Sequence, residues 1–261
     1  MPVIKTNEWL LDFYQDPLKL CKKLQLFFPG ISEGEIFDYF RLHGMYYKAV
    51  KSPSSLVETM ISNDIWTIVE KEQQALQKKW AGPDVPIIIL PSNTNDKKLM
   101  RETKGKAGLA FSDKLILFIP ETIAMNELKA LFIHEYNHVC RIWHTKKDEK
   151  AFTLLDSIIL EGLAEHAVLE RLGEAFTSSW TKLYSKQKLE TIWKEIILPE
   201  RKLKKSHARH NQFLYGWKGL PKMAGYCAGY YLVQKYATSH NTAMIDLLEE
   251  SAEVIAGLTV E

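Results

Sequence analysis

The chain has 261 residues, 46% of them hydrophobic, so it can bury a core as one large domain or as two lobes. Its 34 basic and 32 acidic residues leave a net charge of +2, which argues against general nucleic-acid binding. No apolar run is long enough to span a membrane and the N-terminal residues lack a signal-peptide pattern, so we expect no membrane partner. There are only three cysteines, which predicts a cytoplasmic protein with no disulfide framework.

The first 82 residues are predicted to form an N-terminal helical region. Helical periodicity marks residues 7–14, 17–26, 33–41 and 54–80, and Gly82-Pro83 ends the last of these segments. Residues 83–261 are then predicted to form the region that carries the chemistry, either as a separate domain or as part of one continuous domain.

A short β region follows the helical region. Residues 87–90 are rich in β-branched side chains and are flanked by prolines, and residues 115–119 stop at Pro120. Residues 105–111 are predicted to pair with 115–119 across Ser112 and Asp113. The sequence therefore predicts a helix-dominated α+β fold with a small sheet ahead of the next helix.

Residues 134–138 read His-Glu-Tyr-Asn-His, within a stretch from 127 to 144 that has no glycine or proline. On a helix, positions i and i+4 share a face, so His134 and His138 can bind one metal ion. Glu135 lies about 100° round the helix, where it can act as a general base without becoming a ligand. This pattern is typical of a zinc hydrolase, although two buried, satisfied histidines would produce the same string.

A second helix, predicted at residues 151–172 and stopped by Gly173, carries the third ligand candidate. Glu161 follows His138 by 23 positions, which is enough chain for a helix to return alongside the first. Glu165 lies one turn further on the same face, and we expect it to hydrogen-bond a metal-bound histidine, with Asp156 as an alternative. A solvated salt-bridge partner is the competing interpretation of Glu165.

Two other histidines compete with Glu161 as third ligand. His144 occupies the last position of the longer HExxHxxGxxH pattern, but Arg141 replaces the glycine whose left-handed turn that pattern needs. His166 leaves the face shared by Glu161 and Glu165. We therefore favour Glu161.

The C-terminal third is predicted to contain a helix at 174–198, a basic loop at 200–210, and closing helices from Pro221 and from about residue 241. The loop is interpreted as mobile and solvated, with a lid over a cleft as the alternative. Tyr226 and Tyr230 are candidate donors to a developing oxyanion, with His207 and His210 behind them. Tyrosines packed in the core are the competing interpretation.

Three segments carry a resemblance to a known family: HEYNHVCR at 134–141, LLDSIILEGLAEH at 154–166 and PKMAGYCAGYYLV at 221–233. They resemble the YjaZ-type predicted zinc-dependent proteases of bacilli, which are similar to the gluzincin metallopeptidases. The resemblance implies a zincin-like fold, a Zn²⁺ ion on His134, His138 and Glu161, and a peptide substrate. It also implies an edge strand that holds the substrate, for which residues 108–111 are the candidate and an ordinary hairpin strand the alternative. Leu160 stands where aminopeptidases of that group have Asn, so aminopeptidase specificity is not implied.

The function predicted from the sequence is a zinc metallopeptidase in which Glu135 is the general base. The alternative is a binding or regulatory protein on the same scaffold, with a structural or vestigial metal site. The intact Glu135 favours the enzyme, because a structural site has no use for a general base.

Overall fold

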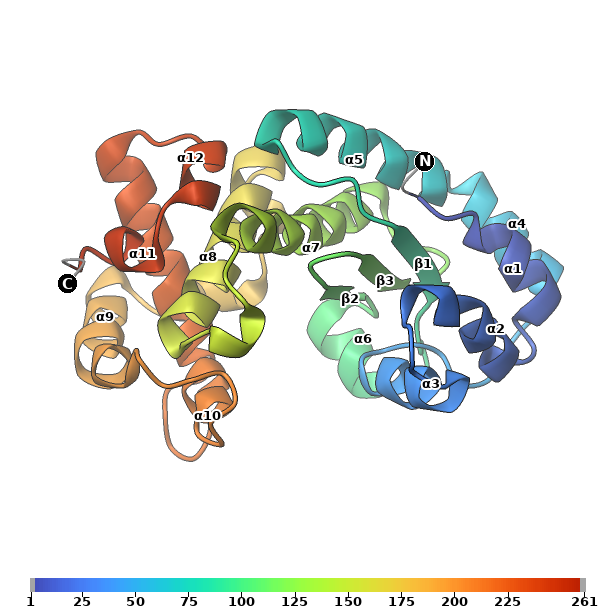
Figure 1. Ribbon diagram of the computed structural model, residues 1–261, viewed down its shortest axis with the longest axis horizontal. Helices are drawn as coiled ribbons and strands as arrows, with labels where there is room; N and C mark the ends of the chain where they lie inside the picture. The colour runs from blue at the N-terminus through green and yellow to red at the C-terminus, as the bar shows by residue number, and fades with distance from the viewer. Residues whose placement is uncertain (1–2, 259–261) are drawn as a thin grey trace. The chain divides into compact units, whose positions relative to one another are not determined.

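The computed structural model describes residues 3–258. Its helices and strands follow one another in this order: α1 Thr6–Phe13, α2 Pro17–Leu24, α3 Glu33–Leu42, α4 Pro53–Ser62, α5 Ile65–Trp80, β1 Ile87–Pro91, α6 Lys97–Thr103, β2 Ala107–Ala110, β3 Leu115–Ile119, α7 Met125–Thr145, α8 Leu154–Leu172, α9 Lys186–Thr191, α10 His210–Tyr215, α11 Ala224–His240, α12 Met244–Glu249 and α13 Ala252–Ile255. The predicted helix-dominated α+β plan, with a small sheet ahead of the motif helix, is confirmed (Figure 1).

The chain divides into two compact units. The first comprises Met1–Ala75 and Asp84–Tyr136, and the second comprises Leu76–Pro83 and Asn137–Glu261. Helix α7 contributes its residues through Tyr136 to the first unit and the remainder to the second. The division predicted at residue 82 stays a prediction.

The first unit is built around a three-stranded mixed sheet in the order β1-β3-β2. β1 and β3 are parallel and fully buried, as their continuous apolar sequences require. β2 pairs with β3 in antiparallel register, Ala107 opposite Phe118 and Ala110 opposite Leu115, which confirms the predicted hairpin. Within the described residues, β2 is an edge strand.

The N-terminal helices are confirmed, but the predicted long helix at 54–80 is wrong. It is divided into α4 and α5, because Asn63 ends α4 and Asp64 adopts a left-handed φ of 54°. Helix α6, between β1 and β2, had no counterpart among the predictions.

The second unit is centred on the pair α8 and α11, which pack against each other along their length. The predicted helix at 174–198 is also wrong. Short 3-10 turns at Glu174–Phe176 and Ser179–Lys182 come first, and the helix begins only at Lys186, capped by Ser185, before passing into a π-helix at Ile192–Ile197. No helix among residues 3–258 combines the length and apolarity needed to cross a membrane.

Candidate metal centre

Helices α7 and α8 bring His134, His138 and Glu161 together. One ligand atom from each residue lies within 4.8 Å of the others, and the Nε2 atom of His138 is 3.6 Å from the Glu161 carboxylate. His138 is 8% exposed, and the other two side chains are partly buried. The three residues that the sequence pattern singled out as ligands therefore form one cluster.

The spacing and chemistry of this cluster fit a zinc ion. Nitrogen and carboxylate ligands bind zinc at 2.0–2.2 Å, so two ligands in a tetrahedral site stand about 3.3–3.6 Å apart. The 3.6 Å between His138 and Glu161 is close to that spacing. Two imidazoles and one carboxylate also leave a fourth position open for water or substrate, as catalytic zinc sites require.

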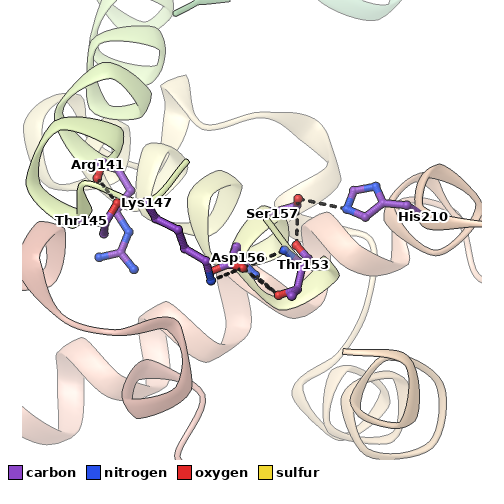
Figure 2. Close-up of polar contacts among 7 residues, drawn as sticks. All are labelled: Arg141, Thr145, Lys147, Thr153, Asp156, Ser157 and His210. Atoms are coloured by element: carbon purple, nitrogen blue, oxygen red, sulfur yellow. Dashed lines mark hydrogen bonds and ion pairs between the residues drawn. The ribbon is translucent and has the colours of Figure 1, made fainter. Parts of the chain in front are cut away.

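The start of α8 is fixed by a network of polar contacts, which Figure 2 shows. Thr153 and Asp156 form a reciprocal capping box, and Lys147 forms an ion pair with the Asp156 carboxylate at 2.7 Å. Asp156 thus holds the helix end. On the neighbouring face, the Ser157 hydroxyl is 3.0 Å from Nε2 of the buried His210.

The predicted basic loop completes the capping of α8. The backbone N–H groups of Leu154 and Leu155 donate to the carbonyls of Leu203 and Arg201, at 2.7 and 3.0 Å. These N–H groups belong to the first turn, where no helical partner exists. Backbone hydrogen bonds from residues 201–205 therefore hold this loop to the helix that carries Glu161, in contrast to the mobile loop that was predicted.

Small residues allow α8 and α11 to approach closely. A Cβ atom added to Gly162 would lie 2.5 Å from the backbone of Gly229, and one added to Gly229 would lie 1.8 Å from the carbonyl oxygen of Ile158. Any larger residue at these positions would push the helices apart. This contact brings the Gly-Tyr repeat of α11 beside Glu161.

The two tyrosines of that repeat lie beside different carboxylates. The Tyr226 hydroxyl hydrogen-bonds Glu161, and burial together with the charge of Glu161 raises its pKa well above the usual value. Burial also raises the pKa of Tyr230 to about 12, with the charge of Glu165 as the next cause. Both hydroxyls therefore remain protonated at neutral pH and able to donate.

Glu135 lies against the edge strand β2. A Cβ atom built on Gly108 would come within 2.4 Å of the Glu135 Cγ and Cδ atoms, so any larger residue would force this carboxylate to move. No local sequence pattern connects Gly108 to a residue 27 positions later, so this contact could not be predicted from the sequence.

Glu165 is 3% exposed and has a defined contact. Its carboxylate accepts hydrogen bonds from the Ser178 backbone N–H at 2.9 Å and from the Ser178 hydroxyl at 2.6 Å. This fixes the carboxylate one turn beyond Glu161, within the interior of the second unit. It argues against the solvated salt-bridge interpretation.

The rival histidines make other contacts. Nε2 of His144 donates to the Trp80 carbonyl at 2.7 Å, and His166 contacts the Gln234 side chain. Helix α7 continues past Arg141, whose guanidinium donates to three carbonyls at the end of α12. His207, in the loop, accepts a hydrogen bond from the Arg209 N–H.

Comparison with known proteins agrees with this geometry. Residues 65–257 match the model of a family described as Predicted Zn-dependent protease (DUF2268). The chain belongs to this family. It is also 39% identical over 218 residues to the uncharacterized protein YjaZ of Bacillus subtilis (strain 168), covering 84% of this chain and 83% of that one. No solved structure matches the chain.

Proposed function

We propose that the protein is a zinc metallopeptidase that hydrolyses peptide bonds. The observation that carries the proposal is the cluster of His134, His138 and Glu161, with Glu135 one position along the same helix as the two imidazoles. The family description supports the same activity. A metal site with a structural role alone would need no neighbouring carboxylate held against an edge strand.

In this proposal His134, His138 and Glu161 would hold Zn²⁺, and Glu165 would support one of the histidines. Bound zinc would lower the pKa of water toward neutrality and polarise the substrate carbonyl. Glu135 takes the proton from the attacking water and passes it to the leaving amine. Tyr226 stays protonated beside Glu161 and would exchange its hydrogen bond to that carboxylate for one to the developing oxyanion, with Tyr230 as the alternative donor.

The edge of β2 provides a place for the substrate backbone. Each of its four residues is partly exposed, and Gly108 lies directly against Glu135. An extended peptide that pairs with residues 108–111 would add a strand to the sheet and bring its backbone past the general base. Peptide and protein chains can bind in this way without a fixed side-chain sequence.

The metal site is tested by elemental analysis of purified protein. We expect near-stoichiometric zinc in the wild type and a sharp loss of zinc in Glu161→Gln. Removing a ligand should lower the affinity for zinc by more than the roughly 10- to 100-fold that is typical when a residue that only hydrogen-bonds a ligand is changed. Glu170→Gln is the matched control, because Glu170 lies on the same helix and forms a surface ion pair with Lys79. Equal zinc in all three proteins would contradict the assignment of Glu161.

Catalysis is tested with a quenched peptide library, with and without chelator. Glu135→Gln is expected to retain zinc and lose nearly all hydrolysis. Gly108→Ala is expected to do the same, because its methyl group displaces the Glu135 carboxylate while leaving the ligands in place. Zinc-loaded protein that cleaves no peptide, and that loses its fold on chelation, would favour the structural or regulatory alternative.

A further inference from the structure

Five aromatic rings of the second unit form a continuous row. Trp180 contacts Tyr226 and Tyr230, with ring centroids 5.2 and 6.1 Å apart. Tyr226 in turn contacts Tyr215 at 5.5 Å, and Tyr215 stacks on Trp217 at 5.1 Å with an angle of 16° between the planes. The rings come from a 3-10 turn, from α10, from the loop after it and from α11.

The row is partly open to solvent. None of the five residues belongs to the buried core, and Trp217 is 55% exposed. The other four rings are only partly exposed, so the row is open to solvent chiefly at Trp217 and runs inward from there to Tyr226. Trp and Tyr supply large contact areas at low conformational cost, so they dominate binding sites.

The loop that carries Trp217 is held in a defined shape. Between Gly216 and Met223 it has four residues with left-handed φ, two of which, Lys218 and Met223, are not glycine. A Cβ atom on Gly216 would come within 1.8 Å of the Pro221 carbonyl oxygen. Left-handed conformations of non-glycine residues cost free energy and are maintained where the surroundings require them. The loop thus presents Trp217 in a fixed orientation.

The row leads directly to the candidate metal centre. Tyr226 hydrogen-bonds the ligand candidate Glu161, and two ring contacts connect Tyr226 with Trp217. The centroid separations place Trp217 at most about 11 Å from Tyr226, which an extended peptide covers in about three residues.

We propose that this aromatic row is a substrate subsite that binds an aromatic side chain about three residues from the scissile bond. The proposal rests on the proposed peptidase function and adds a substrate class to it: peptides with one aromatic residue at a fixed distance from the cleaved bond. Stacking on Trp217 and Tyr215 supplies the affinity.

The experiment uses zinc-loaded protein and a series of equal-length alanine- and glycine-based peptides in which one Phe is moved through every position. Wild-type cleavage mapped by mass spectrometry gives the scissile bond, and calorimetry on Glu135→Gln gives the affinity of each intact peptide. We expect one Phe position, about three residues from the cleaved bond, to increase affinity and kcat/KM about tenfold, the effect of ~1.4 kcal/mol.

Trp217→Ala is expected to abolish that increase, whereas Trp217→Phe retains most of it. Trp143→Ala is the matched control, since Trp143 is 54% exposed on α7 and lies outside the row. It is expected to behave as the wild type does.

The outcomes separate the two proposals. Cleavage with no preferred Phe position, or a preference that survives Trp217→Ala, would overturn the subsite and leave the peptidase intact. Failure of the wild type to cleave any peptide and of Glu135→Gln to bind any would overturn the proposed function and the subsite with it. A uniform loss of cleavage in Trp217→Ala, shared by Trp217→Phe, would assign the row a purely structural role.

Discussion

Replacing Gly162 by alanine would place a methyl group in the closest contact between α8 and α11. The new Cβ atom would lie 2.5 Å from the carbonyl carbon and oxygen of Gly229 and 2.9 Å from the Tyr230 nitrogen. Ordinary contacts between carbon atoms are about 3.5–4.0 Å, so the helices must separate by about 1 Å. Because Glu161 and Tyr226 lie on the two sides of this contact, their hydrogen bond would be stretched.

The expected effect on stability is modest. Overpacking costs about 1–3 kcal/mol, and the higher helix propensity of alanine returns about 0.5–1 kcal/mol. The net loss is therefore about 0–2.5 kcal/mol, a decrease of up to roughly 10 °C in Tm for a chain of this size. Displacing a catalytic group by 1 Å costs about 100-fold in rate. We expect kcat/KM to fall by about that factor while zinc is retained.

Thermal unfolding, zinc content and peptide hydrolysis would be measured side by side. Gly34→Ala is the control, since a Cβ atom added to Gly34 in α3 would meet nothing within 4 Å. This variant should be slightly more stable than the wild type. A Gly162→Ala protein with unchanged Tm and unchanged turnover would refute the reasoning, because it would show that α11 tolerates the displacement without consequence.

Three further predictions concern the same unit. Burial lowers the pKa of His210, so the folded state favours the neutral ring. The unfolded chain binds a proton at this position more readily, so the free energy of unfolding falls as the pH drops below about 6.5, the usual histidine pKa. The slope from this one group is at most ~1.4 kcal/mol per pH unit. Unfolding curves from pH 7.5 to 5 should therefore shift less in His210→Gln than in the wild type. Arg141→Met leaves three backbone carbonyls without their donor and should cost about 3 kcal/mol in urea denaturation; a loss below 1 kcal/mol would contradict the contact. Added zinc at about 100 times its Kd should stabilise the wild type by ~2.7 kcal/mol and leave Glu161→Gln unaffected, and an equal shift in both would indicate binding elsewhere.

The sequence predicted those parts of the site that depend on local periodicity. The spacing of His134 and His138 follows from one turn of helix, and the length of chain to Glu161 permits an antiparallel return. The fit of Gly108 against Glu135, by contrast, depends on the packing of a strand against a helix that follows it. Such contacts leave no periodic signal, so they become visible only in three dimensions.

The helix boundaries failed where local signals compete. Asp64 interrupts the helix predicted at 54–80 by adopting a left-handed conformation. Aspartate adopts this conformation at low cost, but its presence in a sequence does not require it. The helix predicted at 174–198 begins late because Ser185 caps it, and the preceding serines favour turns. Caps deserve more weight than apolar periodicity in such segments.

The first turn of α8 also bears on how the protein folds. Its Leu154 and Leu155 N–H groups are satisfied by carbonyls nearly fifty residues later, at Leu203 and Arg201. The helical propensity of residues 154–172 acts as soon as this segment has been synthesised, but the two hydrogen bonds can form only after residue 203 has been added. Pairing between residues so far apart in the sequence also slows folding. On the ribosome, Glu161 would reach its final register only after residues 201–203 had been synthesised. Pulsed hydrogen exchange during refolding would contradict this order if the Leu154 and Leu155 amides became protected before residues 201–205 had docked.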